Sequence, residues 1–204
     1  MSTVNKENFR NKENSHSKED SPNNVRALVE SSLLVAIGFV LSFVSHLIGL
    51  RMPQGGSFTL LSMLPILTIG LRHGLKWGFA GGFIYACLQM LQDFWPPPTG
   101  TVFGYICVIM LDYILAFTVL GLSGLFKGRG YGLLYAAPLC CFLRFVSHFI
   151  SGIVIWNIYK GELPVWQYSL TYNGSFMGFE LLTIIAVGAI LCKTAPFLFD
   201  YSYK

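Results

Sequence analysis

Long apolar runs separated by short polar connections make up most of this chain. Of its 204 residues, 53% are hydrophobic and 12% are charged, against roughly 25% charged residues in soluble globular domains. The charged residues are also unevenly spread, because nine of the 24 lie within residues 1–26. A soluble fold of the remainder would expose large apolar patches to water. The composition therefore predicts an all-α integral membrane protein.

Six apolar segments are candidates for membrane spans, which need about 20 mostly apolar residues. They are Val25–Ile48, Phe58–Leu71, Leu75–Leu91, Thr101–Phe126, Leu133–Ile158 and Tyr172–Cys192. The second segment is short and contains Pro65, so we expect it to be tilted, broken or only partly spanning. Turns rich in proline, glycine or charge separate the segments, most clearly at residues 93–100 and 127–130.

The Lys and Arg side chains alternate with these six segments. Eleven of the 14 lie in the first 26 residues, in the second and fourth connections, and after the sixth segment. Only Arg51 and Lys160 lie in the other connections, and Arg144 lies inside the fifth segment. In membrane proteins the cytoplasmic loops carry the excess of positive charge. The pattern predicts six spans with both termini in the cytoplasm, which places the aromatic, proline-rich connections on the outer face.

Composition divides the chain into three regions. Residues 1–25 are rich in Asn, Ser, Lys and Glu and contain no apolar run for a secretory signal, so we expect a disordered cytoplasmic tail. Residues 26–195 are expected to form a six-helix transmembrane, substrate-binding domain. Residues 196–204 are expected to form a cytoplasmic C-terminus.

Motifs for catalysis and metal binding are missing from the sequence. It contains no HExxH, GxSxG or P-loop pattern. Its five cysteines lie inside apolar runs without a CxxC pair or a histidine at ligand spacing, so we expect them to be small buried hydrophobic residues. We therefore expect neither an enzyme nor a bound metal or cofactor.

Four ionisable side chains lie inside the predicted spans, at Asp112, Arg144, His148 and Glu180. A charge at the centre of a membrane helix costs roughly 2.5–3.5 kcal/mol on insertion, so a functional role is the first hypothesis for each. For Arg144 and Glu180, a structural ion pair between helices is an equally good interpretation.

One face of the fifth segment carries several of the candidate residues. Arg144, His148, Gly152 and Trp156 are spaced four residues apart and therefore lie along one stripe of a helix. The stripe rises from the middle of the membrane to the outer surface, where it ends in an indole. Gly152 leaves space where a flat ligand can approach the backbone, or where a neighbouring helix can pack.

Further candidates lie on the fourth and sixth segments. Asp112 and Tyr113 lie on the fourth, and Asn173 lies at the outer end of the sixth, preceded by Tyr168. A carboxylate, an amide, an imidazole and several aromatic faces suit a planar, hydrogen-bonding ligand, including a cationic one. These features predict a protein that binds and passes a small molecule.

Six stretches recur in the same order in a known family. They are Gly55–Leu60 with Met63 and Pro65, Leu71–Gly74, Asp112–Phe117, Gly121–Gly124, Arg144–Gly152 leading to Trp156, and Tyr168–Gly174. With these stretches the chain resembles, over about residues 26–195, the ThiT (YuaJ) family. Members of that family are the thiamine-specific, substrate-binding S components of energy-coupling factor vitamin transporters.

The resemblance implies a six-helix S-component fold that holds thiamine near the extracellular face. By position, it assigns substrate binding to Asp112, Tyr113, His148, Gly152, Trp156, Tyr168 and Asn173. Asp112 falls where the family has a glutamate, which shortens the reach of the carboxylate by one methylene group. A tryptophan of the family's first outer loop has no counterpart between Leu47 and Phe58.

The resemblance also implies partners, namely a transmembrane coupling protein and two ATPase subunits. Small residues such as Ser32 and Ala36 on the first segment would permit close contact with the coupling protein. The sequence thus predicts a high-affinity thiamine-binding subunit in the cell membrane, which imports thiamine with energy from partner ATPases. The alternative is a stand-alone secondary carrier for a small cationic aromatic solute, in which Asp112, His148 and Glu180 relay protons.

Overall fold

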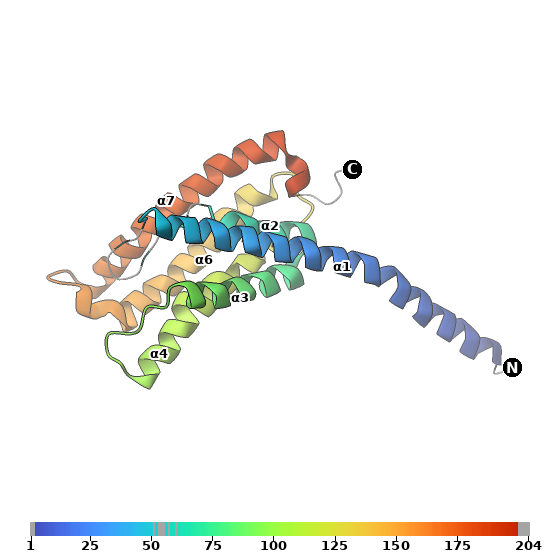
Figure 1. Cartoon of the computed structure of the whole chain (residues 1–204), viewed down its shortest axis with the longest axis horizontal. Coiled ribbons are helices and arrows are strands. Elements are labelled where there is room, and N and C mark those ends of the chain that lie inside the picture. The colour runs from blue at the N-terminus through green and yellow to red at the C-terminus, as the bar shows by residue number, and fades with distance from the viewer. Residues whose placement is uncertain (1–2, 51, 53–55, 57, 60, 200–204) are drawn as a thin grey trace.

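The structure, a computed structural model, describes the backbone of residues 3–50, 52, 56, 58–59 and 61–199, and side chains from residue 23 onward. Every regular element in these ranges is a helix (Figure 1). The elements are α1 (Thr3–Leu47), α2 (Met63–His73), α3 (Leu75–Gln92), α4 (Val102–Val108), η2 (Ile109–Leu115), α5 (Ala116–Thr118), η3 (Val119–Phe126), α6 (Gly132–Val154), η4 (Trp156–Tyr159), α7 (Val165–Thr194) and η5 (Pro196–Leu198). Because α4 to η3 form one continuous segment, the predicted all-α bundle of six helical segments is confirmed.

Four of the six segments are long and apolar enough to cross a membrane. They are Asn23–Leu47, Val102–Phe126, Gly132–Val154 and Val165–Thr194. The second segment, α2, has only 11 residues, in agreement with its predicted shortness, and eight of them are buried. This short helix therefore lies inside the bundle, where the longer helices surround it.

Helix α1 is longer than its apolar run. It continues from Val25 back to Thr3 and projects beyond the bundle (Figure 1). Residues 3–24 are thus helical where the composition predicts disorder. Extending an existing helix is much easier than nucleating a new one, which accounts for the continuity with the apolar part. The division of the chain at residues 25 and 195 stays a prediction.

Glycines bring α3 into backbone contact with α5 and η3. A Cβ atom added to Gly78 would lie 2.9 Å from Cα of Gly121, and one added to Gly121 would lie 2.7 Å from Cα of Phe79. One added to Gly82 would lie 2.6 Å from the carbonyl oxygen of Phe117. Close approach of this kind is how small residues support helix packing inside a membrane. These glycine contacts therefore set the distance between α3 and the Val102–Phe126 segment, which carries Asp112.

The end of α6 and the start of α7 differ from the predicted boundaries. Helix α7 begins at Val165, directly after Pro164, and not at the predicted Tyr172. Pro164 is the N-cap residue and has an extended backbone, and proline disfavours a helical conformation in the residue before it, so the helix begins just after Pro164. As a result Tyr168 lies on a helix, where the sequence predicted a loop. Helix α6 ends at Val154 and continues as the tight turn η4.

A cluster of charged side chains connects α1, α2 and the C-terminal turn. Glu30 on α1 accepts hydrogen bonds from Arg26 at 2.7 Å and from Arg72 at 2.9 Å, and it contacts His73 at 3.0 Å. Arg72 also donates to the carbonyl oxygen of Phe197 at 2.6 Å. The cluster joins α1, the end of α2 and the C-terminal turn, at the end of the bundle away from the predicted site.

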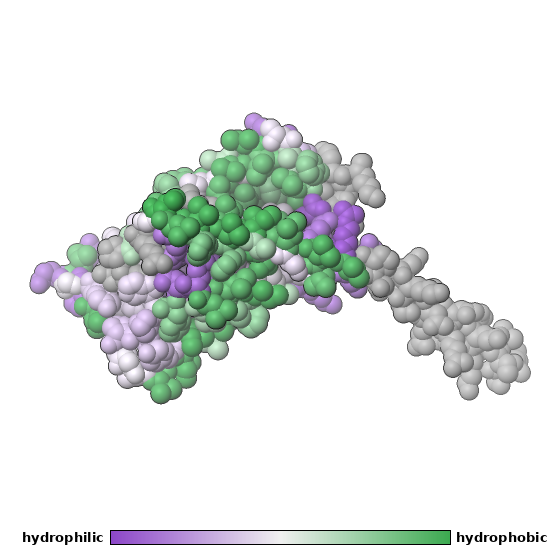
Figure 2. Space-filling model, in the orientation of Figure 1, coloured by the Kyte–Doolittle hydropathy of each residue, from purple (hydrophilic) through white to green (hydrophobic). Residues whose placement is uncertain are grey.

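Large apolar side chains cover the outside of the bundle. Figure 2 shows this surface along α1 and the helices beside it. The exposed apolar side chains of α1 include Val25, Leu28, Val29, Leu33, Ile37, Val40, Phe43, Val44 and Leu47. In water such a surface would drive aggregation, whereas in a bilayer it contacts lipid tails.

The glycine contact predicts a difference between two substitutions. Gly121→Ala forces a methyl group against the backbone of α3, so it is expected to destabilise the fold by about 1–3 kcal/mol. Gly178→Ala is the matched control, because a Cβ there meets no atom within 4 Å, and alanine in a helix is favoured over glycine by roughly 0.5–1 kcal/mol. Thermal unfolding of the two variants in detergent measures the difference. Equal unfolding temperatures would contradict the packing described here.

Candidate ligand-binding site

A polar pocket lies at the end of the bundle where α1 ends and α7 begins. All seven residues predicted from the sequence line it: Asp112, Tyr113, His148, Gly152, Trp156, Tyr168 and Asn173. They come from η2, α6, η4 and α7, which are far apart along the chain. The structure therefore brings the predicted residues together, and their role in binding a ligand stays a prediction.

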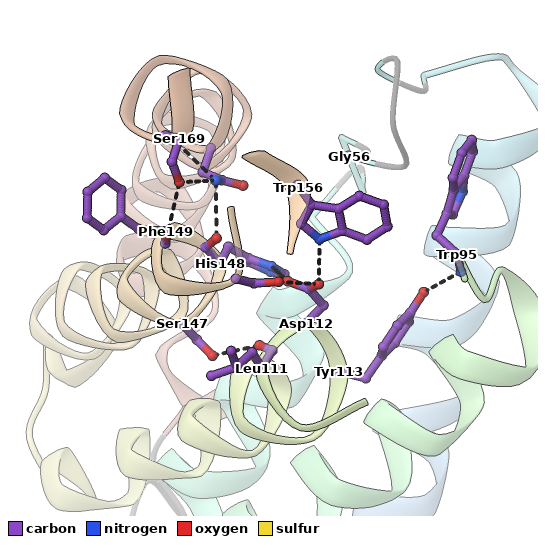
Figure 3. Close-up of polar contacts among 12 residues, drawn as sticks. Gly56, Trp95, Leu111, Asp112, Tyr113, Ser147, His148, Phe149, Trp156 and Ser169 are labelled. Atoms are coloured by element: carbon purple, nitrogen blue, oxygen red, sulfur yellow. Dashed lines mark hydrogen bonds and ion pairs between the residues drawn. The ribbon is translucent and has the colours of Figure 1, made fainter. Parts of the chain in front are cut away.

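The carboxylate of Asp112 is held by three donors from one stretch of chain (Figure 3). Ser151 Oγ donates to Oδ2 at 2.6 Å, and Trp156 Nε1 donates to the same oxygen at 3.0 Å. His148 Nδ1 lies 3.0 Å from Oδ1. Because an ionised carboxylate only accepts hydrogen bonds, Nδ1 carries a proton in this contact, and Nε2 of a neutral ring is then an acceptor. The carboxylate of Asp112 is therefore held in one position at the pocket wall.

The backbone that carries Asp112 is a π-helix, not the regular α-helix predicted for this segment. The wider turn covers Ile109–Leu115, and Ser147 Oγ from α6 donates to the carbonyl oxygen of Leu111 at 2.6 Å. Short π-helical turns occur frequently at functional sites. Here the turn sets the direction in which two consecutive side chains, Asp112 and Tyr113, meet the pocket.

Gly152 and Asn173 lie where α6 and α7 meet. A Cβ atom added to Gly152 would lie 2.9 Å from Cβ of Ser169 and 3.1 Å from Nδ2 of Asn173. Asn173 Nδ2 donates to the carbonyl oxygens of Ser169 at 3.0 Å and His148 at 3.2 Å. Of the two interpretations of Gly152, helix packing thus has direct support. Because the amide nitrogen of Asn173 is engaged by the protein, its carbonyl oxygen is the group it can offer to a ligand.

Aromatic rings form much of the pocket wall. Tyr168 stacks on Tyr172 with ring centroids 5.8 Å apart, and Tyr172 packs edge-on against Phe176 at 6.0 Å. Tyr113 has a second role, because its hydroxyl donates to the carbonyl oxygen of Asp93 at 2.7 Å and accepts from the backbone N–H of Trp95 at 3.1 Å. It therefore fixes the turn after α3 beside the pocket.

Several lining residues were missed from the sequence. They include His46 at the end of α1, and Gln89 and Asp93 at the end of α3. His46 Nδ1 lies 3.6 Å from Asp93 Oδ2. Polar residues at the ends of membrane spans are ordinary, so neither type nor spacing distinguished these three. Their signal is in three dimensions, since the α1 and α3 ends converge on the same pocket.

An ion pair forms the inner end of the site. Arg144 Nη1 lies 3.2 Å from Glu180 Oε2, and both side chains are less than 5% exposed. The Arg144 guanidinium also lies over the ring of Phe117, 4.4 Å from its centroid, and Thr59 Oγ1 donates to Glu180 Oε1. The structural ion pair was one of two interpretations of these residues, and the structure contains it. Arg144 also lines the pocket, so the pair supports the site from below.

The ion pair predicts an asymmetry between single and double substitutions. Glu180→Leu leaves Arg144 charged and buried without its partner, so it is expected to destabilise the fold by about 3–5 kcal/mol. Arg144→Met combined with Glu180→Leu removes both charges and is expected to recover much of that loss. Unfolding of purified variants in detergent measures both effects. A double variant as unstable as the sum of the two single variants would contradict a direct pair.

Comparisons with known proteins identify the family of this chain. The family model described as thiamine transporter protein (Thia_YuaJ) matches residues 28–200. The thiamine transporter ThiT of Bacillus subtilis is 34% identical over 185 residues, which cover 83% of this chain and 91% of that relative. ThiT of Lacticaseibacillus paracasei is 30% identical over 188 residues, which cover 84% of this chain and 89% of that relative.

A solved structure of ThiT from Listeria monocytogenes has the same fold. Its TM-score to this chain is 0.69 at 23% sequence identity, and the match covers 87% of this chain and 99% of that one. Relatives that are named transporters, together with apolar helices long enough to cross a bilayer, identify a multi-pass membrane protein. The family match over most of the chain leads to one conclusion: the chain belongs to the thiamine transporter (Thia_YuaJ) family.

Proposed function

We propose that this chain is the thiamine-binding membrane subunit of an energy-coupling factor transporter. The observation that carries the proposal is the Asp112 carboxylate, fixed by three donors beside the Trp156 indole in a pocket lined by aromatic rings. The relatives named thiamine transporters supply the identity of the ligand. We therefore propose that the seven predicted residues are its binding site.

The chemistry of thiamine complements this pocket. Its thiazolium ring is a permanent cation, which the Asp112 charge and the aromatic faces attract. Its aminopyrimidine carries both a hydrogen-bond donor and acceptors, which match the carbonyl oxygen of Asn173 and the groups around it. A flat ring system can lie against Trp156.

Asp112 is one methylene group shorter than the glutamate of the ThiT family, but its carboxylate can still contact the ligand directly. An ionised carboxylate offers about four lone-pair sites, and three protein donors occupy this one. One site therefore remains for a donor of the ligand. The three contacts also hold the carboxylate in place before the ligand arrives, which reduces the entropy lost on binding.

The proposed partners would supply the energy for transport. Its sequence has no P-loop, so the energy for transport would come from two partner ATPases through a coupling protein. The pocket lies among the connections that are poor in Lys and Arg, so we place it on the extracellular face of the cell membrane, with both termini in the cytoplasm. Thiamine would bind from outside, and ATP hydrolysis would drive tilting of the subunit and release inside.

Binding by the isolated chain is the first test. Titration of the purified protein with thiamine is expected to quench tryptophan fluorescence with a dissociation constant in the nanomolar range. Asp112→Asn is expected to weaken binding by roughly 10-fold or more, because it removes a charged hydrogen-bond acceptor. Trp156→Ala is expected to weaken it by at least about fivefold, through loss of the cation–π contact.

Two matched controls belong to this titration. Trp166→Ala removes an indole that is 57% exposed, and Glu162→Gln removes a carboxylate on the exposed connection before α7; neither residue lines the pocket. Both variants are expected to bind as the wild type does. If neither Asp112→Asn nor Trp156→Ala weakens binding by about 1 kcal/mol, the site lies elsewhere.

Uptake separates the proposed subunit from a stand-alone carrier. Vesicles that hold only this chain are expected to bind thiamine without accumulating it, and uptake is expected when the coupling protein and ATPases are added with ATP. Proton-driven accumulation by the chain alone would contradict the proposal and favour the secondary carrier.

A further inference from the structure

Unpartnered polar atoms are concentrated at the pocket. Apart from His73, which contacts Glu30, eight buried side-chain nitrogen and oxygen atoms of the described residues have no hydrogen-bond partner. Four of these belong to residues that line the pocket: Gln89 Nε2, Arg144 Nε, His148 Nε2 and Tyr168 Oη. Buried polar groups are normally paired, and unpaired ones in a native structure call for an explanation. A ligand with matching donors and acceptors supplies one.

Gln89 is the residue of this group that the sequence did not indicate. Its side chain is only 6% exposed, and it reaches the pocket from α3. His46 and Asp93 lie on the same side, whereas Asp112 and His148 come from η2 and α6. Gln89 thus offers a hydrogen-bonding group from a different wall than the carboxylate.

The contacts of Ser42 fix the orientation of the Gln89 amide. Gln92 Nε2 donates to Ser42 Oγ at 3.3 Å, and Ser42 Oγ donates its own proton to Gln89 Oε1 at 3.1 Å. The oxygen of Gln89 is therefore engaged by α1, which leaves Nε2 as the free end of the amide. An amide nitrogen only donates hydrogen bonds. The pocket thus contains a pre-oriented donor on the α3 side.

We propose that Gln89 is a specificity-determining residue that donates a hydrogen bond from Nε2 to an acceptor nitrogen of the ligand's pyrimidine ring. The inference rests on the proposed function, since it assumes that thiamine is the ligand. Asp112 on one side accepts a hydrogen bond and Gln89 on another side donates one. Together they select a ring that presents a donor and an acceptor on different edges. A buried donor left unpaired penalises any ligand that lacks the acceptor.

The test pairs two variants with two ligand analogues. Gln89→Leu removes the donor, and Gln167→Leu is the matched control, because it makes the same change on α7 at a residue that does not line the pocket. The analogues carry CH in place of one or the other pyrimidine ring nitrogen. Gln89→Leu is expected to weaken thiamine binding by roughly 10-fold or more, and Gln167→Leu by less than about threefold.

The analogues separate a direct contact from a structural role. One analogue is expected to bind the wild type more weakly than thiamine and to lose little further affinity in Gln89→Leu, because the same hydrogen bond is already absent. If Gln89→Leu weakens thiamine and both analogues equally, Gln89 has only a structural role and the inference fails. Unchanged thiamine binding in Gln89→Leu overturns it as well.

A second variant covers the case in which Gln89→Leu does not fold. Gln89→Glu keeps an oxygen for Ser42 and replaces the donor by an acceptor, so it is expected to lose thiamine binding to a similar extent. A Gln89→Glu variant that binds as the wild type does would overturn the inference. Failure of the wild type to bind thiamine would instead refute the proposed function, so the two failures are distinguishable.

Discussion

The carboxylate of Asp112 connects η2 with α6 and η4 at the pocket wall. It lies on the π-helical turn of the Val102–Phe126 segment, and its three donors come from α6 and η4. A charge inside a bilayer is tolerated only where protein groups compensate it. The donors therefore stabilise the charge and at the same time fix the position of η2 against α6. The geometry that makes Asp112 acceptable in the membrane also fixes it at the pocket wall, where we propose that it binds a cationic ligand.

The remaining architecture supports this contact from three directions. Glycine contacts hold α3 against η3, and Gly152 lets α7 approach α6 closely enough for Asn173 to bond the His148 carbonyl. Below the pocket, the Arg144–Glu180 pair places two further charges in the bundle interior. These charges compensate each other, and the carboxylates of Asp112 and the more exposed Asp93, each beside a histidine, line the pocket above them.

Much of this arrangement could be predicted from the sequence. Apolar runs predicted the six segments, and the rarity of polar groups inside them directed attention to Asp112, His148 and Asn173, which the structure brings to one pocket. What could not be predicted depends on three-dimensional packing. The π-turn at Ile109–Leu115 has no sequence signature, and the start of α7 at Val165 was hidden because loop-like aromatic residues precede Tyr172.

The pocket residues near the ends of the spans could not be predicted from the sequence either. His46, Gln89 and Asp93 have the composition expected at any membrane boundary, so only the convergence of α1 and α3 identifies them as part of the pocket. Gly152, which the sequence singled out, lines the pocket, and its close contact with Ser169 supports helix packing, one of the two interpretations.

A structure of the protein determined with thiamine tests the central claim most directly. If the pocket is the thiamine site, the ligand lies among η2, α6 and α7, with a donor of its aminopyrimidine within hydrogen-bond distance of the Asp112 carboxylate and a ring against Trp156. Thiamine found between other helices, or in this pocket without contact to Asp112, would contradict it.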